Sequence, residues 1–176
     1  METKNLADLY DLPPVDWSTI TTRLDGEITQ APGTGGPDRH TWWLATIDPD
    51  GRPHVTGIGG FWSDGALWFQ TGLSTRKGRN LTRDPRCSAT LATVEFDLVI
   101  EGEAHLVDDP DAVTAFVAEA VAGGWPARVD ESGRAVTADF SAPSAGGPPW
   151  HVFRLVPERA AALQTVEPGG ATRWTF

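Results

Sequence analysis

The sequence FQTGLSTRKGRNLTRDPR, from Phe69 to Arg86, decides how the rest of the chain is interpreted. It follows an apolar run typical of a strand, turns at Gly72, and then presents hydroxyl side chains and a cluster of cations. Five cations fall within its last 11 positions: Arg76, Lys77, Arg79, Arg83 and Arg86. The whole chain has only 14 Lys and Arg residues and a formal net charge of -10. A basic patch on an acidic protein predicts a small anionic ligand, because a polyanion would be repelled by the remaining surface.

The same stretch predicts a short helix over residues 76–83. Ser74 or Thr75 can cap its N-terminus, and the Asp-Pro pair that follows can end it. The amides at a helix N-terminus carry partial positive charge, so Arg76 and Lys77 beside them would complete a cradle for a phosphate group. A solvated basic helix paired with acidic neighbours is the alternative, and charge clustering alone does not separate the two.

Length and composition fit one globular domain of 176 residues, of which 40% are hydrophobic. The sequence pI near 4.7 predicts neither nucleic acid nor an anionic membrane surface as a partner. No apolar run approaches the roughly 20 residues of a membrane span, and no segment resembles a signal peptide, so we expect a cytoplasmic protein. Cys87 has no disulfide partner in the chain and lies in a strand-like run, where we expect it to be a small core residue.

The 19 glycines and 14 prolines predict short strands joined by many turns. The fold class that we expect is mainly β with peripheral helices, built on an antiparallel sheet. The predicted strands cover about residues 41–47, 53–62, 66–71, 87–94, 98–107, 151–163 and 171–176. The predicted helices cover about residues 17–27, 76–83 and 110–122.

Three segments have no predicted helix or strand. They are an extended arm over residues 1–16, a Pro/Gly loop over 31–39 and a long loop over 125–149. The long loop is expected to cover a site or a partner rather than to extend the sheet. We therefore divide the chain into an N-terminal arm and helix, residues 1–40, and one β domain, residues 41–176.

The order of the motifs is more specific than any one of them. A strand pair joined by DPDGRPHVT precedes a hairpin through SDGALWFQTG, then STRKGRNLTRDPR and a VIEGEAHLV strand. This order resembles the pyridoxamine 5'-phosphate oxidase-like family, the flavin and deazaflavin oxidoreductases with the FMN-binding split β-barrel. The resemblance covers about residues 41–106 well and the HVFRLVPER and ATRWTF segments more weakly. It implies an antiparallel split β-barrel and a homodimer with two cofactor sites at the subunit interface.

The resemblance also implies which residues bind the cofactor. The segment from Ser74 to Lys77 would hold the phosphate, the strand from His54 would line the ring, and Trp150 and Trp174 are candidates to come from the other subunit. The implied cofactor-binding residues are His54, Val55, Thr56, Gly57, Gln70, Thr71, Ser74, Thr75, Arg76, Lys77, Asn80, Trp150 and Trp174.

FMN is the general ligand of the family that this chain resembles, the deazaflavin coenzyme F-420 is the alternative, and some relatives bind haem or biliverdin. The implied activity is hydride transfer between the bound cofactor and a small organic substrate. No catalytic acid or base is expected, because the cofactor itself carries the hydride. The tail after Leu163 does not clearly show the Arg and His segment of pyridoxamine 5'-phosphate oxidase proper, which argues against vitamin B6 oxidation. A non-enzymatic split-barrel protein that binds or senses a flavin, haem or aromatic ligand is the second hypothesis.

Other patterns point to no further chemistry. The four histidines are far apart in the sequence, so we expect no metal site, and a Gly-x-Gly-x-x-Gly fingerprint is absent. Gly57, Gly59 and Gly60 would bend a strand at a barrel corner and admit a flat ring beside it. Four tryptophans could form an aromatic substrate pocket, although packing in the core or an interface is the simpler explanation: Trp42, Trp43, Trp62 and Trp68.

Overall fold

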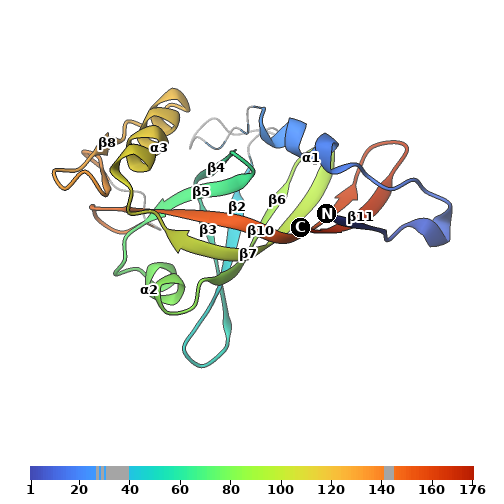
Figure 1. Ribbon diagram of the computed structural model, residues 1–176, viewed down its shortest axis with the longest axis horizontal. Helices are drawn as coiled ribbons and strands as arrows, with labels where there is room; N and C mark the ends of the chain where they lie inside the picture. Colours follow the sequence, from blue (N-terminus) through green and yellow to red (C-terminus); the bar gives the residue numbers. More distant parts are fainter. Residues whose placement is uncertain (27, 29, 31–39, 141–144) are drawn as a thin grey trace.

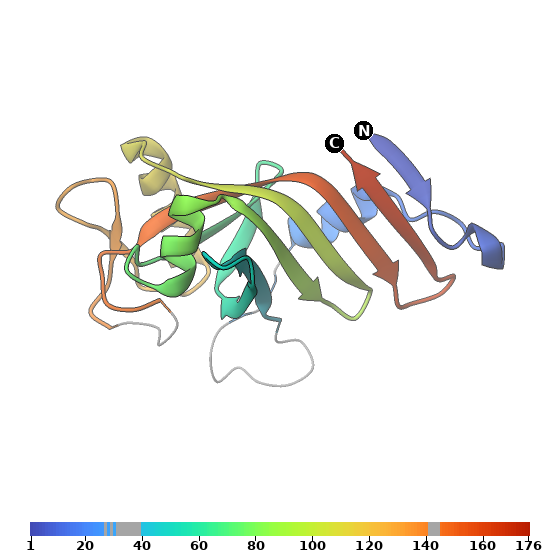
Figure 2. The same cartoon turned by 90° about the horizontal axis from the view of Figure 1, so that it is seen from below.

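The computed structural model describes residues 1–26, 28, 30, 40–140 and 145–176. Over these residues the chain forms an antiparallel β fold with three α-helices at its periphery (Figures 1 and 2), which confirms the predicted fold class. The strands are β1 (Glu2–Asn5), β2 (Trp42–Ile47), β3 (Pro53–Ile58), β4 (Gly60–Ser63), β5 (Ala66–Thr71), β6 (Arg86–Ala92), β7 (Phe96–Leu106), β8 (Arg128–Val129), β9 (Val136–Thr137), β10 (His151–Gln164) and β11 (Gly170–Thr175). The helices are the 3-10 helix η1 (Asp8–Tyr10) and the α-helices α1 (Trp17–Leu24), α2 (Arg76–Arg83) and α3 (Pro110–Ala122).

One nine-stranded sheet dominates the fold, in the order β1-β11-β10-β7-β6-β2-β3, with β5 added to β10 and β4 added to β5. The central strand is β10, which pairs with β7 along one side. Along its other side, His151–Leu155 pair with β5 and Arg159–Gln164 pair with β11. Its register against β7 shifts between Pro157 and Arg159, and this irregularity bends the strand.

The sheet does not close between β3 and β5. Among the described residues, β3 pairs only with β2, and the pairing of β5 with β4 ends where Gly60 meets Phe69. The free edge of β3 and the last two residues of β5, Gln70 and Thr71, therefore flank an opening, here called the split. Helix α2 begins five residues after Thr71, so it lies at the end of the split.

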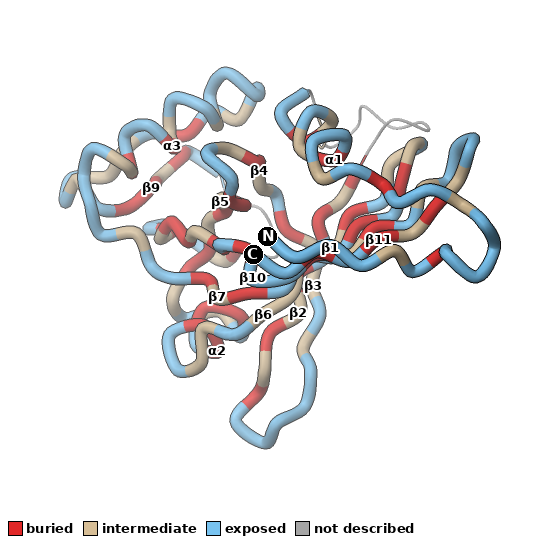
Figure 3. Tube along the Cα trace, turned by 45° about the vertical axis from the view of Figure 1, so that its right-hand side comes forward, coloured by how far each residue is buried: buried red, intermediate tan, exposed pale blue. Residues whose placement is uncertain are grey.

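Two hydrophobic clusters hold the sheet and its helices together. The main core fills the inner face and includes the fully buried Trp42 and the stacked rings of Phe69 and Phe153, 5.7 Å apart. The second cluster packs Phe116 of α3 against the other face of β5 and β10, around Trp150. Figure 3 shows the buried segments running along the strands, with exposed residues at the hairpin tips.

The strand predicted over residues 53–62 is divided into two. Gly59 separates β3, which pairs with β2, from β4, which pairs with β5. The corner depends on Gly60, because a Cβ atom there would lie 2.8 Å from the Trp68 carbonyl oxygen. The expectation of a bend at these glycines is confirmed, and the expectation of one continuous strand is wrong.

The other predicted elements agree with the structure except at their ends. The arm over residues 1–16 contains β1, which pairs with β11, and Val15 N donates to Thr172 Oγ1 at 2.7 Å. The long loop over 125–149 contains β8 and β9, which form their own two-stranded sheet. The predicted loop over 31–39 lies outside the described residues. None of the helices in the described ranges has the length and apolar character that crossing a lipid bilayer requires.

Candidate functional site

Hydroxyl groups and a helix terminus meet at the end of the split. Thr75 is the N-cap of α2, and its Oγ1 accepts a hydrogen bond from Gly78 N at 3.1 Å. The same Oγ1 donates to Gly72 O at 2.8 Å and lies 3.0 Å from the Thr71 hydroxyl. The end of β5 is thereby tied to the first turn of α2, where helix amides carry partial positive charge. The predicted helix and its cap at Thr75 are confirmed.

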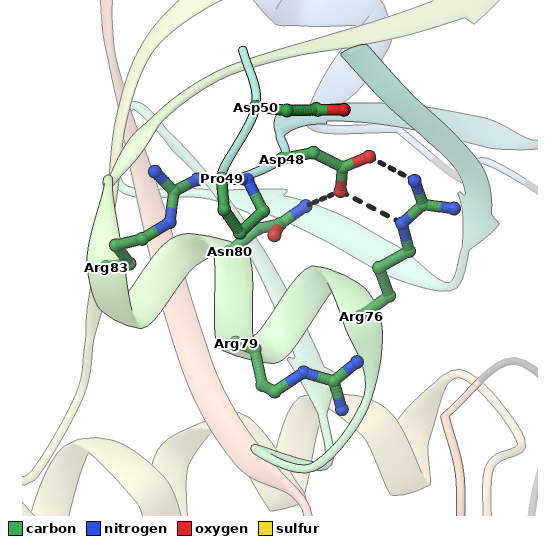
Figure 4. Close-up of a pocket in the computed structure, with 7 residues that line it drawn as sticks. All are labelled: Asp48, Pro49, Asp50, Arg76, Arg79, Asn80 and Arg83. Atoms are coloured by element: carbon green, nitrogen blue, oxygen red, sulfur yellow. Dashed lines mark hydrogen bonds and ion pairs between the residues drawn. The ribbon is translucent and has the colours of Figure 1, made fainter. Parts of the chain in front are cut away.

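The arginines of α2 line an open hollow of about 620 Å³ beside the β2–β3 turn (Figure 4). Arg79 donates a hydrogen bond to the backbone carbonyl oxygen of Ser74, so Ser74 takes part through its backbone. Arg83 donates to the carbonyl oxygen of Ile47. The residues around the hollow are Asp48, Pro49, Asp50, Arg76, Arg79, Asn80 and Arg83. Both signs of charge are present, so the hollow is not a purely basic patch.

A single carboxylate organises this side of α2. Asp48 Oδ1 accepts from Arg76 Nε at 2.9 Å and from Asn80 Nδ2 at 2.9 Å, while Oδ2 accepts from Arg76 Nη2 (Figure 4). Asn80 Nδ2 also donates to Thr46 Oγ1 at 3.1 Å. Asn80 is nearly buried at the wall of the hollow, where its amide holds Asp48 and Thr46.

The two adjacent cations at the start of α2 have different environments. The Arg76 side chain is 57% exposed, whereas Lys77 is 3% exposed. Burial lowers the pKa of the Lys77 ammonium. The hydrogen bonds that Arg76 donates to Asp48 raise the pKa of Arg76, which is charged in any case. Arg76 is therefore the cation of this pair that the single chain presents to a ligand.

The residues predicted to line a ring alternate between the two faces of β3. His54 and Thr56 pair with Thr46 and Leu44, whereas Val55 and Gly57 pair with the outward residues of β2. The pKa of His54 is lowered, first by burial and then by the charge of Arg76. His54 is therefore close enough to α2 for the charge of Arg76 to affect its protonation.

Two buried polar atoms lie beside the split without a hydrogen-bond partner among the described residues: Gln70 Oε1 and His151 Nδ1. Gln70 precedes Thr71 at the end of β5, and His151 pairs with Thr71 across the sheet. Buried polar atoms normally have a partner, so unpaired ones indicate a place where a ligand, water or another chain can bind.

The family model described as pyridoxamine 5'-phosphate oxidase matches residues 36–164. This chain belongs to that family. The match includes β2 to β10, and so it contains the split, α2 and the residues around the hollow. The resemblance inferred from the motif order is confirmed.

Individual members of the pyridoxamine 5'-phosphate oxidase family resemble the chain over most of its length. A pyridoxine/pyridoxamine 5'-phosphate oxidase from Paracidovorax citrulli is 30% identical over 154 residues, which cover 78% of this chain and 68% of the relative. One of the same description from Paraburkholderia phymatum is 30% identical over 177 residues, covering 87% and 83%. A crystal structure of a pyridoxamine 5'-phosphate oxidase-related, FMN binding protein from Nostoc punctiforme has a TM-score of 0.59 at 18% identity, covering 93% of each chain, and agrees in fold.

The tryptophans proposed for the site lie mostly in the cores of this family member. Trp174 is buried in the main core, 5.1 Å from the Trp17 ring, and Trp150 is buried in the second cluster with its Nε1 donating to Gly146 O. Trp42 and Trp62 are also core residues, whereas Trp43 is exposed. These positions do not bring Trp150 and Trp174 together within one chain.

Sequence reasoning missed two residues of the site in this family member, Asp48 and His151. The Asp48-Pro49-Asp50-Gly51 run was interpreted only as the link between two strands, and Asp84 only as part of the Asp-Pro pair that ends the helix. Asp84 instead pairs with Arg86, outside the hollow. The signal for Asp48 was present in the sequence, since an acidic residue in a hairpin next to a basic helix can pair with that helix.

Acid should remove the contribution of Asp48 to stability. Hydrogen bonds from Arg76 and then Asn80 lower the pKa of Asp48 to about 2. The folded-state pKa lies below the unfolded value of about 4, so the ionised group stabilises the fold above about pH 4 and loses this effect toward about pH 2. We expect the difference in unfolding free energy between wild type and Asp48→Asn to be constant from pH ~8 to ~5 and to shrink below pH ~4. Denaturant unfolding across this range measures it, and a difference that shrinks between pH ~8 and ~6 would implicate another group such as His54.

Cys87 should be unreactive in the folded protein. Burial raises the pKa of its thiol to about 12, so almost none is thiolate at neutral pH. It lies on β6 between Thr46 and Gly102 of the neighbouring strands. We expect alkylation by iodoacetamide at neutral pH to be slow in the native protein and complete after unfolding, as followed by mass spectrometry. Rapid labelling before unfolding would contradict this placement.

Proposed function

We propose that the protein is a flavin-dependent oxidoreductase that binds FMN at the split and transfers hydride between the flavin and a small organic substrate. The observation that carries the proposal is the Thr75-capped N-terminus of α2, with the half-exposed Arg76 beside it, at the end of an opening in the sheet. A helix N-terminus with an arginine and hydroxyl groups suits a phosphate monoester. The family and the FMN-binding neighbour in fold support a flavin over an unrelated anion.

The residues beside the split fit a flavin. The buried His151 Nδ1, on the same face of the sheet as Thr71, has no partner in the described part of the chain, and a flavin ring carries donors and acceptors that could satisfy it. A Cβ atom at Gly59 would meet nothing within 4 Å, so space is open beside the corner of β3 and β4. In this arrangement the N-terminus of α2 and Arg76 would bind the phosphate, while the hydroxyls of Thr71 and Thr75, which are engaged with each other and with Gly72 O, hold the turn that presents them.

A bound flavin supplies the hydride chemistry. The protein's part is to anchor the phosphate, place backbone and small side chains along β3 beside the ring, and exclude water from the covered face. We assign no acid or base to the chain.

The test is an absorption and fluorescence titration of the purified protein with FMN, riboflavin and the deazaflavin coenzyme F-420. We expect saturable FMN binding, with riboflavin weaker because it lacks the phosphate. The proposal would be overturned if none of the three ligands bound. Turnover of the reduced or oxidised flavin by added substrates then separates an enzyme from a flavin carrier, and pyridoxamine 5'-phosphate is one substrate to include because two relatives are named for it.

We further propose a homodimer in which the second chain completes each site. Apolar side chains are exposed along the outer face of the sheet, where Trp43 lies beside Thr90, which in turn lies beside Val99. Exposed apolar side chains such as Trp43 and Val99 on one face of a sheet favour association. Strand β3, whose other edge is unpaired among the described residues, pairs with β2, the strand that carries Trp43.

A charge placed on this face should separate the subunits and release the cofactor. We expect Trp43→Glu to shift the protein from dimer to monomer in sedimentation velocity and to weaken FMN binding by at least about tenfold, roughly 1.4 kcal/mol. Val121→Glu on α3 is the matched control, because Val121 is 50% exposed and Trp43 is 52% exposed. A monomeric Trp43→Glu protein with unchanged FMN affinity would show that one chain forms the whole site.

A further inference from the structure

The contact between the β2–β3 turn and α2 is made by a nearly buried carboxylate and a half-exposed guanidinium. The Asp48 side chain is 7% exposed and the Arg76 side chain is 57% exposed. Asp48 accepts from Nε and Nη2 of Arg76, so the two groups form a bidentate pair. A guanidinium has five N–H donors, and this pairing leaves three of them for a ligand on the other side.

The carboxylate is itself held from several directions. Asn80 Nδ2 donates to Asp48 Oδ1 at 2.9 Å and to Thr46 Oγ1 at 3.1 Å, which connects α2 to β2. In the turn, Asp48 N donates to Arg52 O at 2.8 Å and Gly51 N donates to Asp48 O at 2.9 Å. The position of the carboxylate is therefore fixed before any ligand arrives.

We propose that Asp48 is a positioning residue, which orients Arg76 for the phosphate group of the cofactor although its own charge repels that group. This inference rests on the proposed function. Asp48 touches no ligand in this scheme and acts through Arg76 alone.

Two opposing effects decide whether Asp48 strengthens or weakens the binding of a phosphate group. The negative charge of Asp48 lowers the local potential for an anion, but the hollow is open and water screens that repulsion. A free arginine side chain would lose rotamer freedom on binding, and that loss is not reduced by solvent or salt. The proposal is that ordering Arg76 in advance outweighs the screened repulsion.

The direction in which FMN affinity changes when Asp48 loses its charge tests the proposal, and two isosteric substitutions in the same hollow measure it. Asp48→Asn and Asp50→Asn each remove one negative charge, but Asp50 forms no hydrogen bond or ion pair with Arg76 among the described residues and acts on it only through its charge. We expect Asp48→Asn to weaken FMN binding at least fivefold and to leave riboflavin binding unchanged. Asp50→Asn should leave FMN binding unchanged or tighten it. Tighter FMN binding by Asp48→Asn would mean that repulsion dominates and would overturn the proposal.

A double-mutant cycle tests whether Asp48 acts through Arg76. In an Arg76→Ala background, Asp48→Asn should produce no further loss of FMN affinity. An equal loss in both backgrounds would assign Asp48 a merely structural role. Thermal unfolding of each variant checks that the fold is kept, and if Asp48→Asn does not fold, Asn80→Ala retains the charge while removing one of the bonds that fix it and should weaken FMN binding by a smaller factor.

A ligand-free measurement separates this inference from the proposed function. The ¹⁵N relaxation order parameter of the Arg76 Nε–H group, assigned with Arg76→Lys, should be high in the wild type and in Asp50→Asn and should fall in Asp48→Asn. If the wild type bound no flavin, the proposed function would fail and with it the role toward a phosphate. A low wild-type order parameter would overturn the positioning of Arg76 whatever the protein binds.

Discussion

Replacing Arg76 by alanine is expected to weaken FMN binding by at least about tenfold, or roughly 1.4 kcal/mol, and to affect riboflavin little. Arg76 is the half-exposed cation beside the α2 N-terminus, and Asp48 holds it with two of its five donors. Its loss removes a charge-assisted bond to phosphate, a type that is stronger than a neutral hydrogen bond. Fluorescence titration with the two flavins measures the effect.

The control for this substitution is Arg173→Ala on β11, which changes the net charge equally at an exposed position outside the hollow. We expect it to bind FMN as the wild type does. Equal losses for FMN and riboflavin in Arg76→Ala would place the effect in the fold or the ring site rather than at the phosphate. The same affinity for FMN in wild type and Arg76→Ala would remove Arg76 from the site.

Replacing Gly78 by alanine is expected to destabilise the protein and to impair the phosphate cradle together. Gly78 lies in the first turn of α2 against the β5–α2 turn, and a Cβ atom there would collide with the Gly72 carbonyl oxygen and lie 3.0 Å from Leu73 Cα. Both neighbours are backbone, so α2 must move away from Thr71 and Gly72. Such overpacking costs typically about 1–3 kcal/mol, which we expect to lower the melting temperature by roughly 2–12 °C.

The matched control is Gly123→Ala at the end of α3, because a Cβ atom there would lie 3.5 Å from Glu119 O, an ordinary contact, and its φ of -76° does not require glycine. Differential scanning calorimetry of both variants, with and without FMN, gives the melting temperatures and the shift that the ligand causes. We expect the FMN-dependent shift to be smaller in Gly78→Ala than in Gly123→Ala. A Gly78→Ala protein with wild-type melting and wild-type binding would show that α2 can adjust without cost.

The parts of the fold that the sequence predicted well are those with local signals. The helix α2 begins after its Thr75 cap and ends before Pro85, and both boundaries follow from neighbouring residues. The strands with clear turns at their ends were predicted to within a few residues. The division at Gly59 was not predicted, because the reason for it is the close approach of β5 to Gly60, which lies seven or more residues away along the chain.

The sequence predicted which segment forms the candidate site, but it did not predict that an aspartate lies among its cations or that one of the cations is buried. The cluster of Thr71, Thr75 and Arg76 follows from a single continuous stretch, but the Asp48 contact joins residues 28 apart and depends on how the β2–β3 hairpin folds onto α2. The burial of Lys77 was equally hidden, since an eight-residue helix shows too few turns to reveal which face is covered. Long-range contacts of this kind are set by tertiary packing.

Two long strands limit how the split can widen. Both β7 and β10 run uninterrupted from the α2 end of the molecule to the hairpin that ends in β11, and they stay paired past the irregularity at Pro157. The two ends of the molecule therefore cannot swing apart about a hinge without breaking this ladder. A movement that admits a ligand therefore has to involve the unpaired edge of β3 or α2, and α2 is joined to the β2–β3 hairpin by its hydrogen bonds to Thr46, Ile47 and Asp48.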